Sequence, residues 1–175
     1  MEYHKLHRGR DESVLYLDFD GVLHHEDCWW HPRRGPYLRA GPEFTLFQHA
    51  PLLEELLSPY PNVKVILSTS WVRRYGVTHT AKQLPPGLRA RVIAATFHTR
   101  MNEAAFAEKP RGVQVLEDVA RRRPANWLAL DDDSNGWAEG AERHLVLTHP
   151  ERGISEAGVL SALRVALQKN FREGR

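Results

Sequence analysis

Short apolar runs along this chain alternate with segments in which apolar residues recur at helical spacing. Such alternation predicts a parallel sheet whose two faces are covered by helices. We therefore expect a single three-layer α/β domain over residues 1–175, with a mostly parallel five-stranded sheet. The strand-like runs are Val14–Phe19, Val63–Leu67, Val92–Thr96, Trp127–Leu130 and His144–Leu147.

Three segments have the pattern of helices. In Ala50–Leu57 the leucines fall at helical spacing, and Pro51 lies near the start, where proline is tolerated. Gly112–Arg122 carries its apolar residues on one face. Ser155 is the predicted N-cap of a last helix that runs to about Phe171.

Composition narrows the class of protein. The chain has 175 residues, of which 42% are hydrophobic, enough for one domain with a core. A formal charge of +2 argues against nucleic-acid binding driven by overall charge, although local basic clusters can still contact phosphates. The single Cys28 cannot form an internal disulfide, and we interpret it as inert. Without a signal-like or membrane-spanning apolar run, we expect a cytoplasmic protein with no membrane contact. We also expect a monomer.

Polar side chains follow three of the predicted strands. Asp18 and Asp20 follow the first strand, and Ser68 and Thr69 follow the second. The run 131–133, three aspartates, follows the fourth. Because the carboxyl ends of parallel strands form one edge of a sheet, we expect these groups to lie together.

Carboxylates gathered at one edge would repel each other unless a cation joined them. Like charges about 4 Å apart cost roughly 4 kcal/mol even at an effective dielectric constant of 20. Oxygen-only ligands favour Mg²⁺ over zinc, and a bound cation lets a phosphate approach, with a hydroxyl and a lysine completing its binding. The alternative is that Asp18 and Asp20 are ordinary turn or capping residues.

Four motifs in order resemble those of the haloacid dehalogenase (HAD) superfamily. They are LYLDFDGVL, VKVILSTSW, EKPRG and WLALDDD, which together cover roughly Val14 to Asp133. The forms STSW and ALDDD look closest to the small HAD-like domains of RNA-repair ("Swiss Army Knife") proteins. The resemblance implies a three-layer α/β/α Rossmannoid fold with a minimal cap and Mg²⁺-dependent phosphomonoester hydrolysis.

The resemblance also implies roles for the aspartates. Asp18 would be the nucleophile that forms an aspartyl-phosphate. Asp20 would protonate the leaving oxygen and then take a proton from the hydrolytic water. Asp18, the backbone carbonyl of Asp20 and Asp131 would hold Mg²⁺, with Asp132 as a ligand or neighbour. Because three aspartates follow one another, the alternative is a ligand pair one residue later, Asp132 and Asp133.

Two further roles have two candidates each. Ser68 would hydrogen-bond the phosphoryl group, and Thr69 is the alternative if the strand runs longer. Lys109 would neutralise charge on the phosphoryl group and on Asp18, and Arg111 is the alternative because it stands at a helix start.

The insertion Val22–Phe47 is too short to form a folded cap over the site. It is either a loop whose tryptophans pack on the body or a flap in which Trp30 and Arg33 contact substrate. An uncovered site suits a bulky substrate, such as a phosphorylated nucleic-acid end or a phosphoprotein. Arg73 and Arg74 would also flank the site.

Two other classes of protein compete with a phosphatase. One is a catalytically idle HAD-fold module that binds RNA or a protein partner. The other is a phosphoacceptor signalling domain, which normally carries its phosphorylated aspartate after a central strand, where this chain has Ser68. Intact Asp18, Asp20 and Asp131 argue against the idle module. The physiological substrate stays open.

Overall fold

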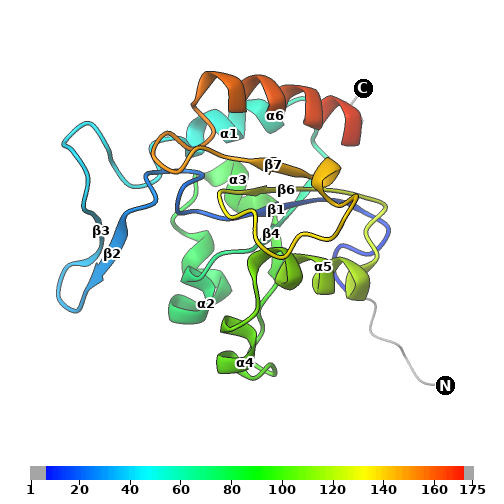
Figure 1. Ribbon diagram of the computed structural model, residues 1–175, viewed down its shortest axis with the longest axis horizontal. Helices are drawn as coiled ribbons and strands as arrows, with labels where there is room; N and C mark the ends of the chain where they lie inside the picture. Colours follow the sequence, from blue (N-terminus) through cyan, green and yellow to red (C-terminus); the bar gives the residue numbers. More distant parts are fainter. Residues whose placement is uncertain (1–6, 172–175) are drawn as a thin grey trace.

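A five-stranded parallel sheet forms the centre of the molecule (Figure 1). The computed structural model describes residues 7–171. All five predicted strands are present, and the strand order is β5-β4-β1-β6-β7. Their bounds are β1 Ser13–Leu17, β4 Lys64–Leu67, β5 Val92–Ala95, β6 Asn126–Asp131 and β7 Leu145–Leu147.

Strand β1 lies at the centre of the sheet, and the side on which successive strands are added changes there. The chain runs outward from β1 to β4 and β5, and then returns to β6 and β7 on the other side. Leu17, the last residue of β1, is in register with Leu67 of β4 and Leu130 of β6. The three residues that directly follow these leucines therefore lie side by side at the edge of the sheet. Such a reversal point is where α/β sheets bind ligands.

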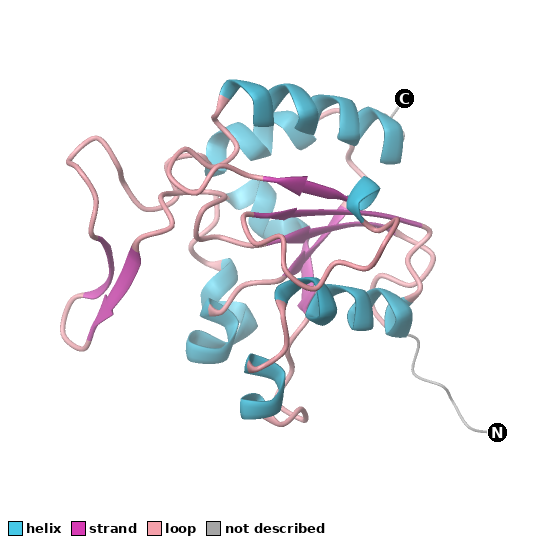
Figure 2. Ribbon diagram, in the orientation of Figure 1, coloured by secondary structure: helices cyan, strands magenta, loops and turns pink. Residues whose placement is uncertain are grey.

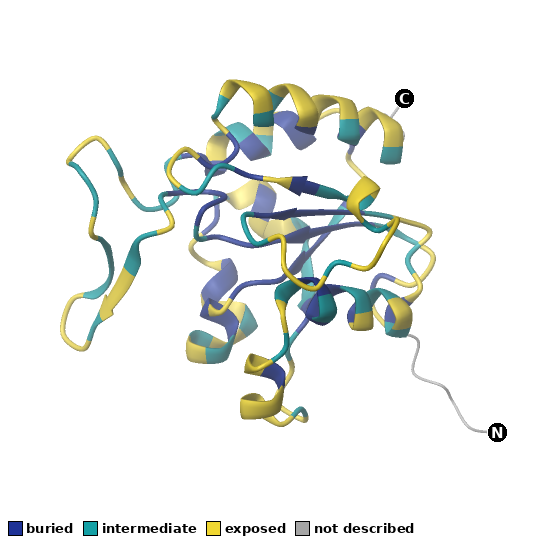
Figure 3. Cartoon of the chain, viewed as in Figure 1, coloured by how far each residue is buried: buried dark blue, intermediate teal, exposed yellow. Residues whose placement is uncertain are grey.

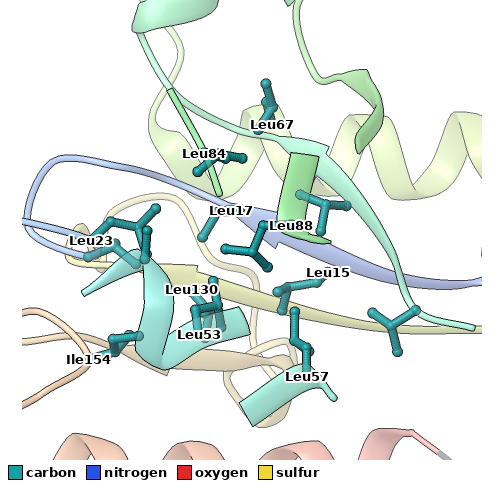
Figure 4. Close-up of a cluster of buried hydrophobic side chains, with 14 of the residues drawn as sticks. Leu15, Leu17, Leu23, Leu53, Leu57, Leu67, Leu84, Leu88, Leu130 and Ile154 are labelled. Carbon is teal, nitrogen blue, oxygen red and sulfur yellow. The ribbon is translucent and has the colours of Figure 1, made fainter. Parts of the chain in front are cut away.

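Helices cover both faces of the sheet (Figure 2). Because side chains alternate along a strand, Leu15 and Leu17 face one side and Val14 and Tyr16 the other. Figure 4 shows the leucine-rich cluster on the first side. That side is covered by α1 Ala50–Leu57, α3 Pro86–Arg91 and α6 Ala157–Asn170, and the second by α5 Arg111–Arg122. Each fully buried leucine contributes about 2 kcal/mol to folding.

The helix predictions hold with one correction. The first helix has the predicted bounds, and α5 begins one residue before the predicted start. The N-cap of α6 is Glu156 and not Ser155: the Glu156 carboxylate accepts a hydrogen bond from the Val159 N–H at 2.8 Å. The Ser155 hydroxyl instead donates to the Arg152 carbonyl at 2.7 Å.

Three helices were not predicted from the pattern. They are α2 Trp71–Ala81, α3 Pro86–Arg91 and α4 Glu103–Ala107. Gly76, at φ +73°, interrupts α2, so its apolar residues do not follow one continuous helical stripe. The other two helices are too short to show a period. Within residues 7–171 no helix has the length and apolar character needed to cross a bilayer.

The insertion after β1 contains a two-stranded antiparallel hairpin. Its strands are β2 Cys28–His31 and β3 Gly35–Leu38, and Gly35 at φ +74° closes the turn between them. The hairpin projects from the end of the molecule at which the strands of the main sheet end (Figure 2). Its residues are exposed or half-buried (Figure 3). We call residues 28–38 the flap.

Candidate active site

Three carboxylates meet where β1 and β6 end. Asp18 directly follows β1 and is 4% exposed, and Asp131 is the last residue of β6 and is 1% exposed. Oxygen atoms of Asp18, Asp131 and Asp132 lie within 4.8 Å of one another. The Asp133 N–H donates to Asp131 Oδ1 at 3.0 Å, so Asp133 forms the following turn. The strand register thus brings the predicted acids together.

Arg111 lies against two of these carboxylates. Its Nη2 is 3.2 Å from Asp18 Oδ2, and its Nε is 3.4 Å from Asp131 Oδ2. Its Nη1 donates to the Ser68 carbonyl at 2.5 Å. Arg111 is the first residue of α5, which directs its side chain across the ends of the strands. One guanidinium therefore faces a cluster of three carboxylates.

Burial and mutual repulsion disfavour the charged forms of these carboxyl groups. Burial, followed by the charge of Asp18, raises the pKa of Asp131 to about 9 and that of Asp132 to about 7. Burial also raises the pKa of Asp18, against the opposing effect of Arg111. If all three carboxylates were ionised, they would carry more negative charge than Arg111 compensates, and the donor atoms of the cluster are all oxygens. This donor set fits a hard divalent cation such as Mg²⁺.

Gly21 lets Asp132 approach this cluster. Its φ is +69°, and a Cβ at this position would collide with the Asp132 carboxylate. The glycine of the first motif is therefore required both by the backbone conformation and by the close approach of Asp132.

The two hydroxyl candidates lie beside Asp18. Ser68 N donates to the Leu17 carbonyl at 2.8 Å, and Ser68 is 1% exposed. Within the described part of the chain its Oγ has no hydrogen-bond partner. The Thr69 hydroxyl hydrogen-bonds Asp18 and so opposes the rise in the pKa of that carboxyl. Of the two hydroxyls, that of Thr69 contacts Asp18, and the part of either hydroxyl in phosphoryl binding stays a prediction.

Lys109 is not brought to the carboxylates. Its Nζ contacts the two carboxylate oxygens of Glu117 at 2.9 and 2.7 Å. Lys109 precedes the helix, whereas Arg111 begins it, and only Arg111 is directed toward Asp18. The contact predicted for Lys109 is therefore made by the alternative residue, and the catalytic part of either residue stays a prediction.

Asp20 has a different environment from Asp18. Its Oδ1 accepts hydrogen bonds from Trp71 Nε1 at 3.0 Å and from His24 Nε2 at 2.9 Å. His24 is fully buried, and its ring packs against Phe47 with centroids 4.8 Å apart. The contacts of His24 and Trp71 with Asp20 were not predicted from the sequence. The available signal was their position: His24 directly follows the first motif, and Trp71 is the last residue of the second.

Cys28 also lies beside Asp20. Atoms of Asp20, His24 and Cys28 that could ligate a metal lie within 4.8 Å of one another. Burial, and next the charge of Asp20, raises the pKa of the Cys28 thiol to about 12. The thiol therefore stays protonated at neutral pH.

A cavity of about 230 Å³ opens between the flap and α2, next to Asp20. Trp30, Trp71 and Tyr75 form aromatic walls, and the Arg74 guanidinium lies 4.3 Å from the centre of a Trp30 ring. Trp30 is 41% exposed. Of the two flap residues predicted to contact substrate, the structure places Trp30 at this cavity. Arg33 lies exposed in the flap turn and does not line it.

Comparisons with curated proteins and with solved structures gave no match. The family described as the HAD domain in Swiss Army Knife RNA repair proteins matches residues 14–159, which include every element of the site. The match covers most of the chain and agrees with the parallel sheet and its acidic edge. The chain is therefore a member of this HAD-domain family of RNA repair proteins.

Proposed function

We propose that this protein is a Mg²⁺-dependent phosphomonoester hydrolase that acts through a phospho-aspartate on Asp18. The observation that carries the proposal is the convergence of Asp18, Asp131, Asp132 and Arg111 at the sheet edge, with Asp20 close by. Family membership supports a phosphatase-like HAD domain, and the residues of the site support the finer assignment.

The proposed reaction has two steps, phosphoryl transfer to Asp18 and hydrolysis of the aspartyl-phosphate. An Asp18 carboxylate oxygen attacks phosphorus while the bond to the leaving oxygen breaks, and Asp20 gives that oxygen a proton. Water then attacks phosphorus and gives a proton to Asp20. The bond between phosphorus and the Asp18 oxygen breaks, so that inorganic phosphate leaves and the Asp18 carboxylate is restored. Arg111 and the hydroxyl of Ser68 or Thr69 would bind phosphoryl oxygens throughout.

A bound Mg²⁺ would be held by Asp18 and Asp131, with Asp132 as a ligand or neighbour. It would offset the negative charge of both the carboxylates and the phosphoryl group. The participation of the Asp20 carbonyl oxygen stays a prediction.

The test is phosphate release from a panel of phosphate esters by the purified chain with Mg²⁺. The panel contains sugar phosphates, a phosphopeptide and oligonucleotides with 3′- or 5′-phosphate. The alternative, an idle module that binds RNA or a protein partner, predicts no release from any ester but retained binding of RNA or the partner.

We further propose that the substrate is bulky, with a phosphorylated nucleic-acid end as the leading candidate. The small flap leaves the site without a folded cap, and the cavity beside Asp20 offers aromatic walls on which a base can stack. The description of the matching family, RNA repair, points the same way. The monomeric state and cytoplasmic location stay expectations from the sequence.

Substrate preference tests this second proposal. We expect a higher kcat/KM for a phosphate-ended oligonucleotide than for sugar phosphates, with a preference that falls as salt rises. Trp30→Ala should reduce the preference about ten-fold, because it removes a stacking wall, whereas Arg33→Ala should reduce it less. If the protein instead prefers a small metabolite and this preference does not change with salt, the flap does not bind substrate and only packs on the body of the protein.

A further inference from the structure

Two N–H donors hold one oxygen of the Asp20 carboxylate. Trp71 Nε1 and His24 Nε2 both lie at hydrogen-bond distance from Oδ1, at 3.0 and 2.9 Å. The Asp20 side chain is 29% exposed and lines the cavity under the flap. An oxygen that accepts two N–H bonds has little capacity left to carry a proton itself.

The protonation of the His24 ring is fixed from its other side. The Phe47 backbone N–H donates to His24 Nδ1 at 3.2 Å, so Nδ1 is an acceptor. In a neutral imidazole the single proton then lies on Nε2, which faces Asp20. His24 therefore donates its Nε2–H to Asp20 Oδ1.

Phe47 is held in a costly conformation to make this contact. Its φ is +59°, a left-handed backbone that is uncommon for a bulky residue. Its ring packs edge-on against Phe19 and Trp71, with centroids 5.1 and 5.2 Å apart. Such conformations persist where the surrounding packing enforces them, and they concentrate at functional sites.

The same geometry argues against a metal at Asp20, His24 and Cys28, although their ligating atoms are close together. A metal on His24 Nε2 would require the ring proton to lie on Nδ1, where the Phe47 N–H already donates. The cluster is better suited to orienting a carboxylate.

We propose that His24 is a positioning residue for Asp20. With Trp71, it holds Oδ1 and turns Oδ2 toward the reacting oxygen. Asp20 Oδ2–H then gives its proton to the leaving oxygen as the phosphorus–oxygen bond breaks, and Oδ2 takes a proton from the attacking water in the second step. The inference rests on the proposed phosphatase activity.

Leaving groups of different basicity test this directly. A good leaving group, such as 4-nitrophenolate, departs without a proton, whereas an alkoxide needs one. The kcat/KM for each ester reports steps up to transfer of the phosphoryl group to Asp18. We compare His24→Leu with His24→Gln, whose amide N–H can replace Nε2–H, and with Trp71→Phe, which keeps an aromatic ring and removes its donor.

For His24→Leu we expect kcat/KM to fall at least about ten-fold more for an alkyl phosphate than for 4-nitrophenyl phosphate. His24→Gln should recover most of this difference, and Trp71→Phe should show a smaller difference of the same kind. An equal loss on both esters in His24→Leu, or no recovery in His24→Gln, would overturn the proposal and leave His24 a packing role.

Nuclear magnetic resonance separates a failure of this inference from a failure of the proposed function. A long-range ¹H–¹⁵N spectrum of the wild-type protein should show His24 as the neutral Nε2–H tautomer. The Nδ1–H tautomer would overturn the geometry on which the inference rests. If the tautomer is as expected but no ester is hydrolysed, the phosphatase assignment fails and the proton-transfer part attributed to Asp20 fails with it.

Discussion

Asp18 and Asp20 stand two residues apart but in contrasting surroundings. Asp18 is buried among charges, with Arg111 at 3.2 Å and the carboxylates of Asp131 and Asp132 close by. Asp20 is partly exposed and held by neutral N–H donors. A charged surrounding can bind a cation and an anionic phosphoryl group, whereas neutral donors orient a carboxylate that must gain and lose a proton. The different surroundings thus suit these two identical side chains to the different tasks that we propose for them.

The Asp18 side of this contrast should be the more sensitive to change. In Asp18→Asn the nucleophile is replaced by an amide of the same shape, and we expect kcat to fall by at least about 10³-fold. Relief of repulsion with Asp131 should leave the thermal unfolding temperature unchanged or raised. Turnover close to wild type would show that the nucleophile is another residue.

A requirement for Mg²⁺ would further distinguish the surroundings of Asp18 from those of Asp20. Removal of Mg²⁺ with a chelator should lower activity by about 10²-fold or more, because the cation stabilises negative charge at Asp18 and the phosphoryl group. Mg²⁺ should also raise the unfolding temperature of the wild-type protein, and it should do so less in Asp131→Asn. Full activity in excess chelator would contradict the proposed metal site.

Replacing Arg111 and Lys109 in turn tests which of these two basic residues acts at Asp18. Arg111→Ala should lower kcat/KM by about 10²-fold, since it removes the guanidinium that contacts Asp18 and Asp131. Lys109→Ala is the matched control and should change it less than about three-fold, because Lys109 pairs with Glu117. The reverse order would restore Lys109 as the basic residue of the third motif.

The smallest effect concerns Cys28, on the Asp20 side. With its pKa raised to about 12 by burial and by Asp20, the thiol should react with iodoacetamide at pH 8 at least about ten-fold more slowly than free cysteine. Asp20→Asn should increase the rate by a few-fold, because it removes the negative charge that opposes the thiolate. Rapid alkylation of the wild-type protein would show that the thiol is not held in this environment.

The strands and the acidic edge could be predicted from the sequence because each depends on local pattern. A continuous apolar run marks each strand, and Asp18, Ser68 and Asp131 directly follow such runs. The parallel register then makes them neighbours. The helix interrupted by Gly76 lacked a continuous pattern, and so did the two-stranded flap, whose strands have only four residues each.

Two of the contacts around Asp20 could not be predicted because they join distant parts of the chain. Trp71 reaches Asp20 across 51 positions, and Phe47 reaches His24 across 23. The choice between Lys109 and Arg111 likewise depends on the residue at which α5 begins, which spacing alone does not determine.

The measurement that tests the central claim most directly is detection of the phosphorylated intermediate. The wild-type protein, mixed with Mg²⁺ and an ester that it hydrolyses, is quenched in acid and examined by mass spectrometry of its peptides. The account predicts one added phosphoryl group on Asp18, absent from Asp18→Asn. Hydrolysis without any phosphorylated peptide, or a phosphoryl group on another residue, would contradict it.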